Sequence, residues 1–292
     1  MLTTTGHQSS LTSAARREQI TRSGDQGRWT TEVGCKTCSM AALCTRSSTD
    51  AVAHARLNDA VQCVRIVRRG HALYRPGNTF GSIYAVRTGS FKTVVMHGEG
   101  HEQVTGFGIV GDTLGIDGIA SGRHSCEAIA LEDSSVCVMP FDLLEMLCRE
   151  MKTIQHHVHR MLSAEIVRES TLMMLLGTMT AEQRVATFLA DLSRRWQARG
   201  YSAAAFTLKM TRQEIGSYLG LKLETVSRTL SKLQGRGLID VHGKDLRILD
   251  FDGLRKSATA GGTSSFSIQP GGGRHAGHAP DTRMSESRPG EP

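Results

Sequence analysis

The sequence has no apolar run that approaches the ~20 residues needed to cross a bilayer, although 39% of its 292 residues are hydrophobic. Its first thirty residues also lack the apolar core of a signal peptide, since Ser, Thr, Arg, Gln and Gly predominate there. These absences predict a cytoplasmic protein without a membrane segment. The same composition predicts that residues 1–30 are disordered.

Motifs of common enzyme classes are also missing. The chain has no Gly-rich cofactor loop, no nucleophile elbow and no HExxH pair. We therefore expect no enzymatic activity. The net charge of +7 is compatible with a polyanionic partner.

Cysteine, in contrast, is well represented, with seven residues. In a cytosolic chain this number favours metal or redox chemistry over disulfides. Cys35, Cys38 and Cys44 form a C-x2-C-x5-C pattern, in which the two-residue gap lets one backbone turn present two sulfurs to one metal centre. A cubane iron–sulfur cluster would need a fourth ligand. A structural zinc site is the alternative, but it usually uses a second CxxC or a His pair, and no second CxxC exists here.

The other four cysteines do not continue this spacing. Cys137 and Cys126 both lie in short apolar runs, and from the residues alone Cys137 would be a buried strand cysteine that acts as a small hydrophobe. Cys63 lies in an alternating strand and Cys148 in a Leu-rich helical stretch. We expect both of these to be core residues.

Short runs separated by glycine extend from about Val61 to Phe141. They include residues 64–67, 82–86, 90–95, 103–107 and 135–139. Regular short strands with turn glycines predict a compact antiparallel barrel or roll. We therefore expect an α+β protein with a sensor domain over residues 31–148.

A helical pattern follows, and we expect a long helix over residues 149–178. Its coiled-coil-like seam consists of His159, Leu162, Ile166, Glu169, Met173 and Leu176. A second apolar face consists of Ile154, Val158, Met161, Leu172 and Leu175. The two faces predict a helix that packs on its own roll and also pairs with a second copy, giving a homodimer; the alternative is a helix wholly buried in one chain.

Residues 179–256 contain a helix-turn-helix pattern. Thr180 begins a helix that ends near Gly200, and Thr211 with Glu214 forms a capping box for the next one. Gly220 stands where a tight turn needs a positive φ. Residues 238–249 predict a strand–turn–strand wing, and the low apolar content of residues 257–292 predicts a disordered tail.

The second helix of this motif is predicted to read DNA bases. Val226, Leu230 and Leu233 form its core face and leave Glu224, Ser227 and Arg228 on the other side, near the helix start. Arg228 can pair with guanine O6 and N7, Glu224 can accept from cytosine N4, and Ser227 allows close approach. Phosphate contacts are expected from Arg212, Lys222, Lys232 and Lys244.

Together these residues resemble the FNR-type branch of the CRP/FNR superfamily of bacterial transcription regulators, over about residues 35–255. Three features carry the resemblance. They are the C-x2-C-x5-C stretch, the run Ala130–Pro140 that looks like the strand delivering the fourth cluster cysteine, and Glu224–Arg228, which looks like the family's E-x-x-S-R reading motif.

The resemblance implies a cyclic-nucleotide-binding-like β-roll, a long dimerisation helix and a C-terminal winged helix-turn-helix. It also implies an oxygen-labile [4Fe-4S] cluster held by Cys35, Cys38, Cys44 and Cys137, with Cys126 as the alternative fourth ligand. The intact cluster would favour a dimeric activator that binds double-stranded DNA at palindromic TTGAT-type half-sites and contacts RNA polymerase. His159 and Glu169 depart from a fully apolar seam, and the Arg- and Gly-rich tail departs from the family's short end.

Two other functions remain as alternatives. A cyclic-nucleotide regulator of the same fold would use a Gly-Glu pair and an Arg-Ser/Thr pair, where this chain has Gly111-Asp112 and His124-Ser125. Its phosphate-clamping arginine is missing unless Arg123 shifts register. An iron–sulfur electron-transfer protein is a different class, in which a helix-turn-helix has no role.

Overall fold

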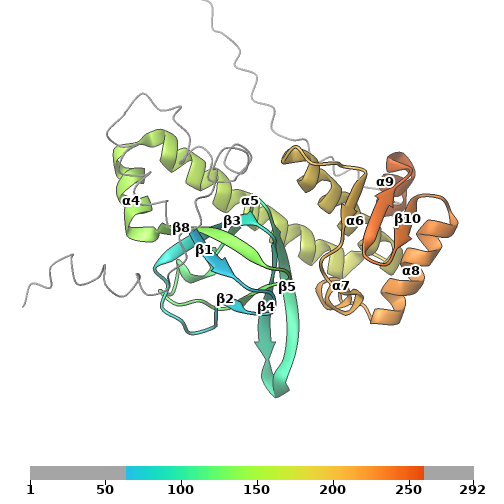
Figure 1. Ribbon diagram of the computed structural model, residues 1–292, viewed down its shortest axis with the longest axis horizontal. Coiled ribbons are helices and arrows are strands. Elements are labelled where there is room, and N and C mark those ends of the chain that lie inside the picture. The colour runs from blue at the N-terminus through green and yellow to red at the C-terminus, as the bar shows by residue number, and fades with distance from the viewer. Residues whose placement is uncertain (1–63, 260–292) are drawn as a thin grey trace, which may run out of the picture. The chain divides into compact units, whose positions relative to one another are not determined.

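The computed structural model describes residues 64–259. The segment 1–30 that we expect to be disordered, and residues 260–292 of the expected tail 257–292, therefore lie outside the described residues. Cys35, Cys38, Cys44 and Cys63 lie outside them as well. The described chain begins with a strand-rich part (Figure 1). Its strands are β1 (Val64–Val67), β2 (Ala72–Tyr74), β3 (Ser82–Thr88), β4 (Ser90–His97), β5 (His101–Ile109), β6 (Thr113–Leu114), β7 (Glu127–Ala130) and β8 (Ser134–Pro140).

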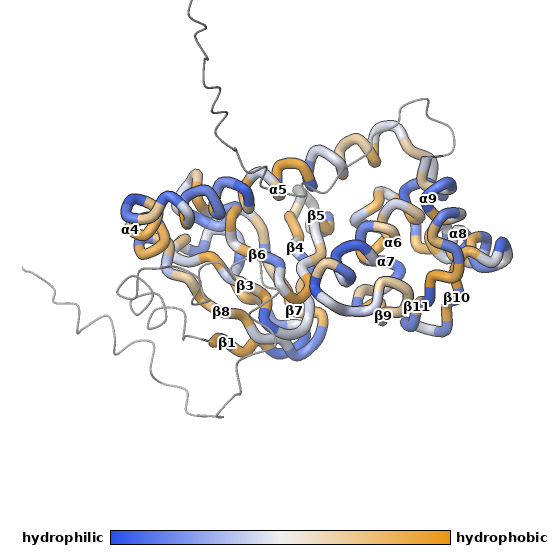
Figure 2. The backbone as a smooth tube through the Cα atoms, turned by 90° about the horizontal axis from the view of Figure 1, so that it is seen from above, coloured by the Kyte–Doolittle hydropathy of each residue, from blue (hydrophilic) through white to orange (hydrophobic). Residues whose placement is uncertain are grey.

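These strands form two four-stranded antiparallel sheets, with the orders β1-β8-β3-β6 and β2-β7-β4-β5. Apolar residues recur along β3, β4 and β8 (Figure 2). Alternate residues of these strands meet in a common core that includes Phe91, Val86 and Val136, all with no exposed surface. The expected antiparallel roll is confirmed. Strands β2 and β6, which are three and two residues long, were not among the expected runs.

Two helices follow the roll, and the break between them lies at Met151. Helix α4 (Phe141–Glu150) ends there because Met151 adopts an extended conformation, with φ −130°. Helix α5 (Lys152–Thr178) then runs for 27 residues. Ile154 and Leu175 on its inner face are buried, so this face packs on its own chain as expected.

The C-terminal part is a winged helix-turn-helix. It consists of α6 (Ala181–Ala198), β9 (Ala205–Thr207), α7 (Arg212–Leu219), α8 (Leu223–Gly235), β10 (Ile239–His242), β11 (Asp245–Ile248) and α9 (Phe251–Thr259). The expected wing is the β10–β11 hairpin, closed by Gly243 at φ 63°. Strand β9 adds a third strand to this sheet and was not anticipated.

Helix α9 corrects the expected start of the tail. Composition placed that boundary at residue 257, but α9 continues to Thr259 and Ser257 is only 4% exposed. The helix contacts α6, and its Leu254 and Ala258 pack into the core of the DNA-binding domain. Between residues 64 and 259, no helix is both long and apolar enough to span a membrane.

The turn of the helix-turn-helix depends on two glycines. Gly220 ends α7 in the left-handed region with φ 62°, as expected. Gly216 was not anticipated: a Cβ there would lie 2.5 Å from the carbonyl oxygen of Leu221. The turn closes over this position, because the Leu221 amide donates to the Gly216 carbonyl at 2.8 Å. Only glycine therefore fits the close approach of the two helices.

We predict that Gly216→Ala destabilises the protein by about 1–3 kcal/mol, because the added methyl group meets backbone that cannot move without opening the turn. Gly235→Ala in α8 is the matched control, since nothing lies within 4 Å of a Cβ there. Thermal unfolding of the two variants checks this. Equal melting temperatures for them would contradict the steric account.

Candidate functional site

Helix α8 presents its polar side away from the core. Glu224 and Arg228 are exposed and Ser227 is partly exposed, whereas Val226 is fully buried. The Arg228 Nε donates to the Glu224 carbonyl oxygen at 3.4 Å, so the arginine lies back along the first turn of the helix. The structure thus brings the three expected base-reading residues together on one face, at the end of the helix where a recognition helix meets bases.

Helix α7 supports this face through its capped start. The Thr211 hydroxyl accepts from the Glu214 amide at 3.1 Å, and the Glu214 carboxylate accepts from the Thr211 amide at 2.7 Å. This is the expected capping box. Glu214 also pairs with Lys92 of β4 at 3.0 Å, so the start of α7 is tied to the roll.

Arg184 of α6 connects three helices, a role that the sequence did not predict. Its guanidinium donates to the carbonyl oxygens of Leu219 at 2.9 Å, Leu176 at 2.8 Å and Met179 at 2.9 Å. These carbonyls belong to the ends of α7 and α5, where helices leave acceptors unpaired. Arg184 therefore joins the end of the long helix to the turn before α8. No local pattern in the sequence signals this bracing.

The expected phosphate-binding residues have different surroundings. Lys222 and Lys244 are exposed. Arg212 donates to the carbonyl of Gly243 at 3.1 Å and so joins α7 to the wing. Lys232 pairs with Glu182 at 2.7 Å, which compensates its charge. Among these four cations, Lys222 and Lys244 are best placed to meet phosphates.

Cys137 lies at the point where the described chain begins. It stands on β8, directly opposite Val64 of β1 on one side and Ala85 of β3 on the other. It is partly exposed and packs against the apolar cluster between the roll and helices α4 and α5. The segment that carries Cys35, Cys38 and Cys44 therefore joins the described chain next to Cys137.

The other candidate ligand, Cys126, faces the interior of the roll. It is 8% exposed, and burial together with the Asp117 carboxylate raises the pKa of its thiol to about 12. A thiolate ligand is disfavoured there, because metal binding requires deprotonation. Cys148 lies on α4 against the same cluster as Cys137, in a partly buried position. Among the cysteines that the structure describes, Cys137 and Cys148 are thus partly exposed and Cys126 is buried.

The residues present fit a cluster only if the two parts of the chain combine. Between residues 64 and 259, no three His, Cys, Asp or Glu side chains gather as a metal site requires. Cys137 can supply one thiolate, and the other three would come from Cys35, Cys38 and Cys44, outside the described residues. One suitable thiol beside the start of β1 is consistent with that division.

A hollow of about 380 Å³ lies between β5, β6 and α5. It is the place to look for a cyclic nucleotide, but the polar groups needed to hold one are engaged. Arg168, which lines the hollow, pairs with Glu165 at 2.9 Å. His124 is buried and interacts with Asp117 at 3.3 Å, and Arg123 donates to the Gly77 carbonyl at 2.8 Å. These engagements do not favour the cyclic-nucleotide alternative.

The outer face of α5 carries the expected seam. Ile166 is 64% exposed and Met173 is 67% exposed, and both are large apolar residues. His159 and Glu169 are exposed on the same face, whereas Leu176 is partly buried against the DNA-binding core of its own chain. Within the described chain, Ile166 and Met173 of the seam are therefore largely exposed, whereas Leu162 and Leu176 are partly buried. His159 and Glu169 interrupt the seam.

Two family models match the chain. A Crp-like helix-turn-helix domain matches residues 183–257, and a cyclic nucleotide-binding domain matches residues 64–151. A solved structure, that of FixK2 from Bradyrhizobium japonicum, is similar with a TM-score of 0.62 and 30% identity, covering 68% of this chain and 98% of that one.

Curated relatives are similar over most of their length. The transcriptional activator protein anr of Pseudomonas aeruginosa is 41% identical over 228 residues, which cover 78% of this chain and 93% of the relative. The anaerobic regulatory protein of Haemophilus influenzae is 38% identical over 222 residues, which cover 76% and 86%. Together with the roll, the long helix and the winged helix-turn-helix, these matches show that the chain is a DNA-binding transcription regulator that belongs to the FNR-type branch of the CRP/FNR superfamily.

Proposed function

We propose that this regulator responds to oxygen or redox state through a [4Fe-4S] cluster held by Cys35, Cys38, Cys44 and Cys137. The observation that carries the proposal is the pairing of Val64 with Cys137. The chain that follows the C-x2-C-x5-C stretch thus enters the described part, 20 residues after Cys44, beside a partly exposed thiol on β8. A relative named anaerobic regulatory protein adds support, although its name describes that protein alone.

When bound, such a cluster would join the four cysteine thiolates through iron–sulfur bonds, and its loss in oxygen would release them. The chain's own part is to join the N-terminal segment to the roll at Cys137. Cys137 packs against the apolar cluster that also holds the start of α5, including Ile154 and Val158. An ordered N-terminal segment would therefore add to the surface on which the dimerisation helix packs.

The DNA target in this proposal is a two-fold site of TTGAT-type half-sites, bound by a homodimer. One α8 from each copy would enter the major groove, with Arg228 paired to a guanine, Glu224 to a cytosine, and Ser227 packed close to the base edges. Lys222, Lys244 and Arg212 would lie toward the phosphates. RNA polymerase is the further partner, and the cytoplasm the location, that an activator of this kind requires.

We predict that replacing Cys137 with Ser abolishes cluster binding, because serine supplies no thiolate. Cys126→Ser and Cys148→Ser, in the same domain, should bind a full complement of iron and sulfide. Metal and acid-labile sulfide analysis of each anaerobically purified variant is the measurement. A full cluster in Cys137→Ser together with loss in Cys126→Ser would overturn the ligand assignment.

Arg228→Ala should weaken binding to the specific site by roughly 1–3 kcal/mol and relax specificity at one guanine. Lys244→Ala is the contrasting variant: a lost phosphate contact weakens binding to every sequence and flattens the salt dependence. Titrations on matched and scrambled duplexes at several salt concentrations separate the two effects. Equal losses on both duplexes for Arg228→Ala would refute its role as a base reader.

Glu169→Ala should strengthen dimerisation of the cluster-free protein. Two Glu169 carboxylates approach each other across the two-fold axis, and their repulsion raises the cost of dimerisation by ~1 kcal/mol in partly screened surroundings. Without it, the variant should dimerise and bind DNA even in air. Glu145→Ala on α4 is the control, because Glu145 is exposed and lies outside the seam.

Sedimentation of cluster-free wild type, Glu169→Ala and Glu145→Ala, with DNA binding measured alongside, tests this account of the seam. It fails if the cluster-free wild type is fully dimeric at micromolar concentration, or if cluster-free Glu169→Ala remains monomeric.

A further inference from the structure

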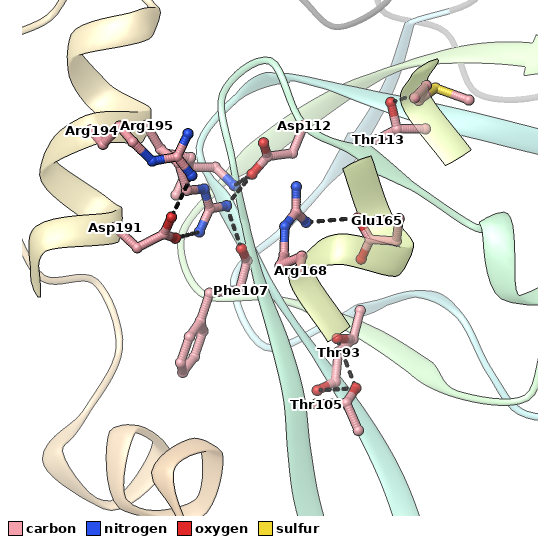
Figure 3. A network of polar contacts seen from close by, with 12 residues as sticks. Thr93, Thr105, Phe107, Asp112, Thr113, Glu165, Arg168, Asp191, Arg194 and Arg195 are labelled. Carbon is pink, nitrogen blue, oxygen red and sulfur yellow. Dashed lines mark hydrogen bonds and ion pairs between the residues drawn. The ribbon is translucent and has the colours of Figure 1, made fainter. Parts of the chain in front are cut away.

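One buried carboxylate links the roll to the DNA-binding domain. Asp112 lies in the turn between β5 and β6 and is 3% exposed. It forms ion pairs with Arg195 of α6 and with Arg199, which lie 83 and 87 residues further along the chain (Figure 3 labels the first of these pairs). Arg195 also donates to the carbonyl oxygen of Phe107 on β5 at 2.6 Å. Arg195 of α6 and Arg199, which directly follows this helix, thus bind a single turn of the roll.

The turn that carries Asp112 is itself fixed. The Asp112 carboxylate accepts from the Ile109 amide at 2.8 Å, and the Asp112 carbonyl accepts from the Val86 amide at 2.9 Å. Gly111 provides the positive φ of 86° that the turn needs. The carboxylate is therefore a rigid part of the roll, and any motion of α6 relative to the roll must break its ion pairs.

The dimerisation helix reaches the same cluster. Arg168 of α5 pairs with Glu165, and its charge acts with those of Arg195 and Arg199 on Asp112. Burial opposes the ionisation of Asp112, but these arginines hold its pKa below the ordinary value. A lowered pKa means that the stabilisation is present above the carboxyl's ordinary pKa and is lost only in acid. The cluster thus stays intact across the neutral range.

The cluster is poorly optimised for stability alone. The Nε atoms of Arg195 and Arg199 are both buried without a hydrogen-bond acceptor within the described residues. Buried ion pairs are often no more stabilising than apolar residues of the same volume, and unpaired buried donors are costly. Ionic groups of this kind do, however, fix one geometry among several that apolar packing would allow.

Apolar packing alone would leave the orientation of the DNA-binding domain less restricted. Phe107 of β5 contacts Phe188 of α6 and Tyr218 of α7, with ring centroids 5.9 and 5.3 Å apart. Ser217 of α7 accepts from the Val104 amide at 2.9 Å at the edge of this contact. The aromatic contact buries apolar surface, whereas the ion pairs of Asp112 restrict the orientation of α6 against the roll.

We propose that Asp112 is a positioning residue for DNA reading: through Arg195 and Arg199 it fixes the angle of the DNA-binding domain against the roll and α5. In a dimer, that angle sets the separation and relative rotation of the two α8 helices. The inference rests on the proposed dimeric reading of TTGAT-type sites. Asp112 touches no base, so its effect should appear in the preferred spacing of half-sites rather than in the reading of one half-site.

The test uses duplexes with two inverted TTGAT half-sites whose central spacer varies by one base pair at a time, and one duplex with a single half-site. Each added base pair turns one half-site by about 34° relative to the other. The full chain is purified anaerobically as wild type, Asp112→Asn, Arg199→Gln and Asp191→Asn. Asp191 is the matched control: it approaches Arg195 at 3.7 Å but belongs to α6 itself and makes no link to the roll.

We expect wild type to prefer one spacing, because only matched geometry lets both copies bind at once. In Asp112→Asn the affinity for that preferred duplex should fall by about tenfold while the preference among spacers flattens. Affinity for the single half-site should stay within about twofold of wild type, since α8 and its support are intact. Asp191→Asn should behave as wild type. Arg199→Gln, which leaves Arg195 on Asp112, keeps the test open if Asp112→Asn does not fold, and it should flatten the preference as well.

An unchanged spacing profile in folded Asp112→Asn and Arg199→Gln would overturn the inference. Tighter binding of the variants to every duplex would also overturn it, because the cluster would then restrain the domain rather than position it. A wild type that binds these duplexes no better than scrambled ones is a different failure: it would refute the proposed DNA target itself.

Discussion

The structure depends on one apolar core that the roll shares with the DNA-binding domain. Val104 and Phe107 of β5 belong to the same buried cluster as Leu189 of α6, Leu219 of α7 and Leu230 of α8. Burial of apolar surface is non-directional, so this core joins the two domains without by itself fixing their angle. The polar contacts of Asp112, Lys92 and Ser217 at the margins of this core restrict the angle between the two domains. A structural change in the roll can therefore shift the recognition helix α8, because both pack on the same core.

Helix α5 connects the two domains and, in the proposed account, also forms the dimer contact. Its inner face is buried against its own chain, and its outer face offers apolar residues interrupted by His159 and Glu169. Arg184 then ties the end of α5 to the turn before α8. In the proposed account, the pairing of two α5 helices and the angle of two α8 helices are therefore set by neighbouring parts of one continuous structure. In the same account, the N-terminal cysteines would act on this structure through Cys137 of the roll.

Local signals in the sequence predicted the DNA-binding domain well. The capping box at Thr211, the turn at Gly220 and the polar face at Glu224 and Arg228 involve residues close in sequence, and the fold and family they indicated are confirmed. Contacts between distant residues could not be predicted in this way. Asp112 and Arg195 are 83 residues apart, and no sequence pattern connects them. Ser257 is buried because α9 packs on α6, which its polar composition does not indicate. The choice of Cys137 over Cys126 came from resemblance and stays a prediction; the structure shows that Cys126 is buried and that Cys137 is partly exposed.

The central claim is that the state of the cysteine site controls DNA binding. It is tested most directly by titrating a duplex of two inverted TTGAT half-sites with the anaerobically purified protein, before and after exposure to air, with iron measured on the same samples. The account predicts that affinity falls by about tenfold or more as iron is lost, because the dimer no longer holds both half-sites at once, and that it returns when iron and sulfide are restored. Undiminished affinity in a sample that has lost its iron would contradict the account.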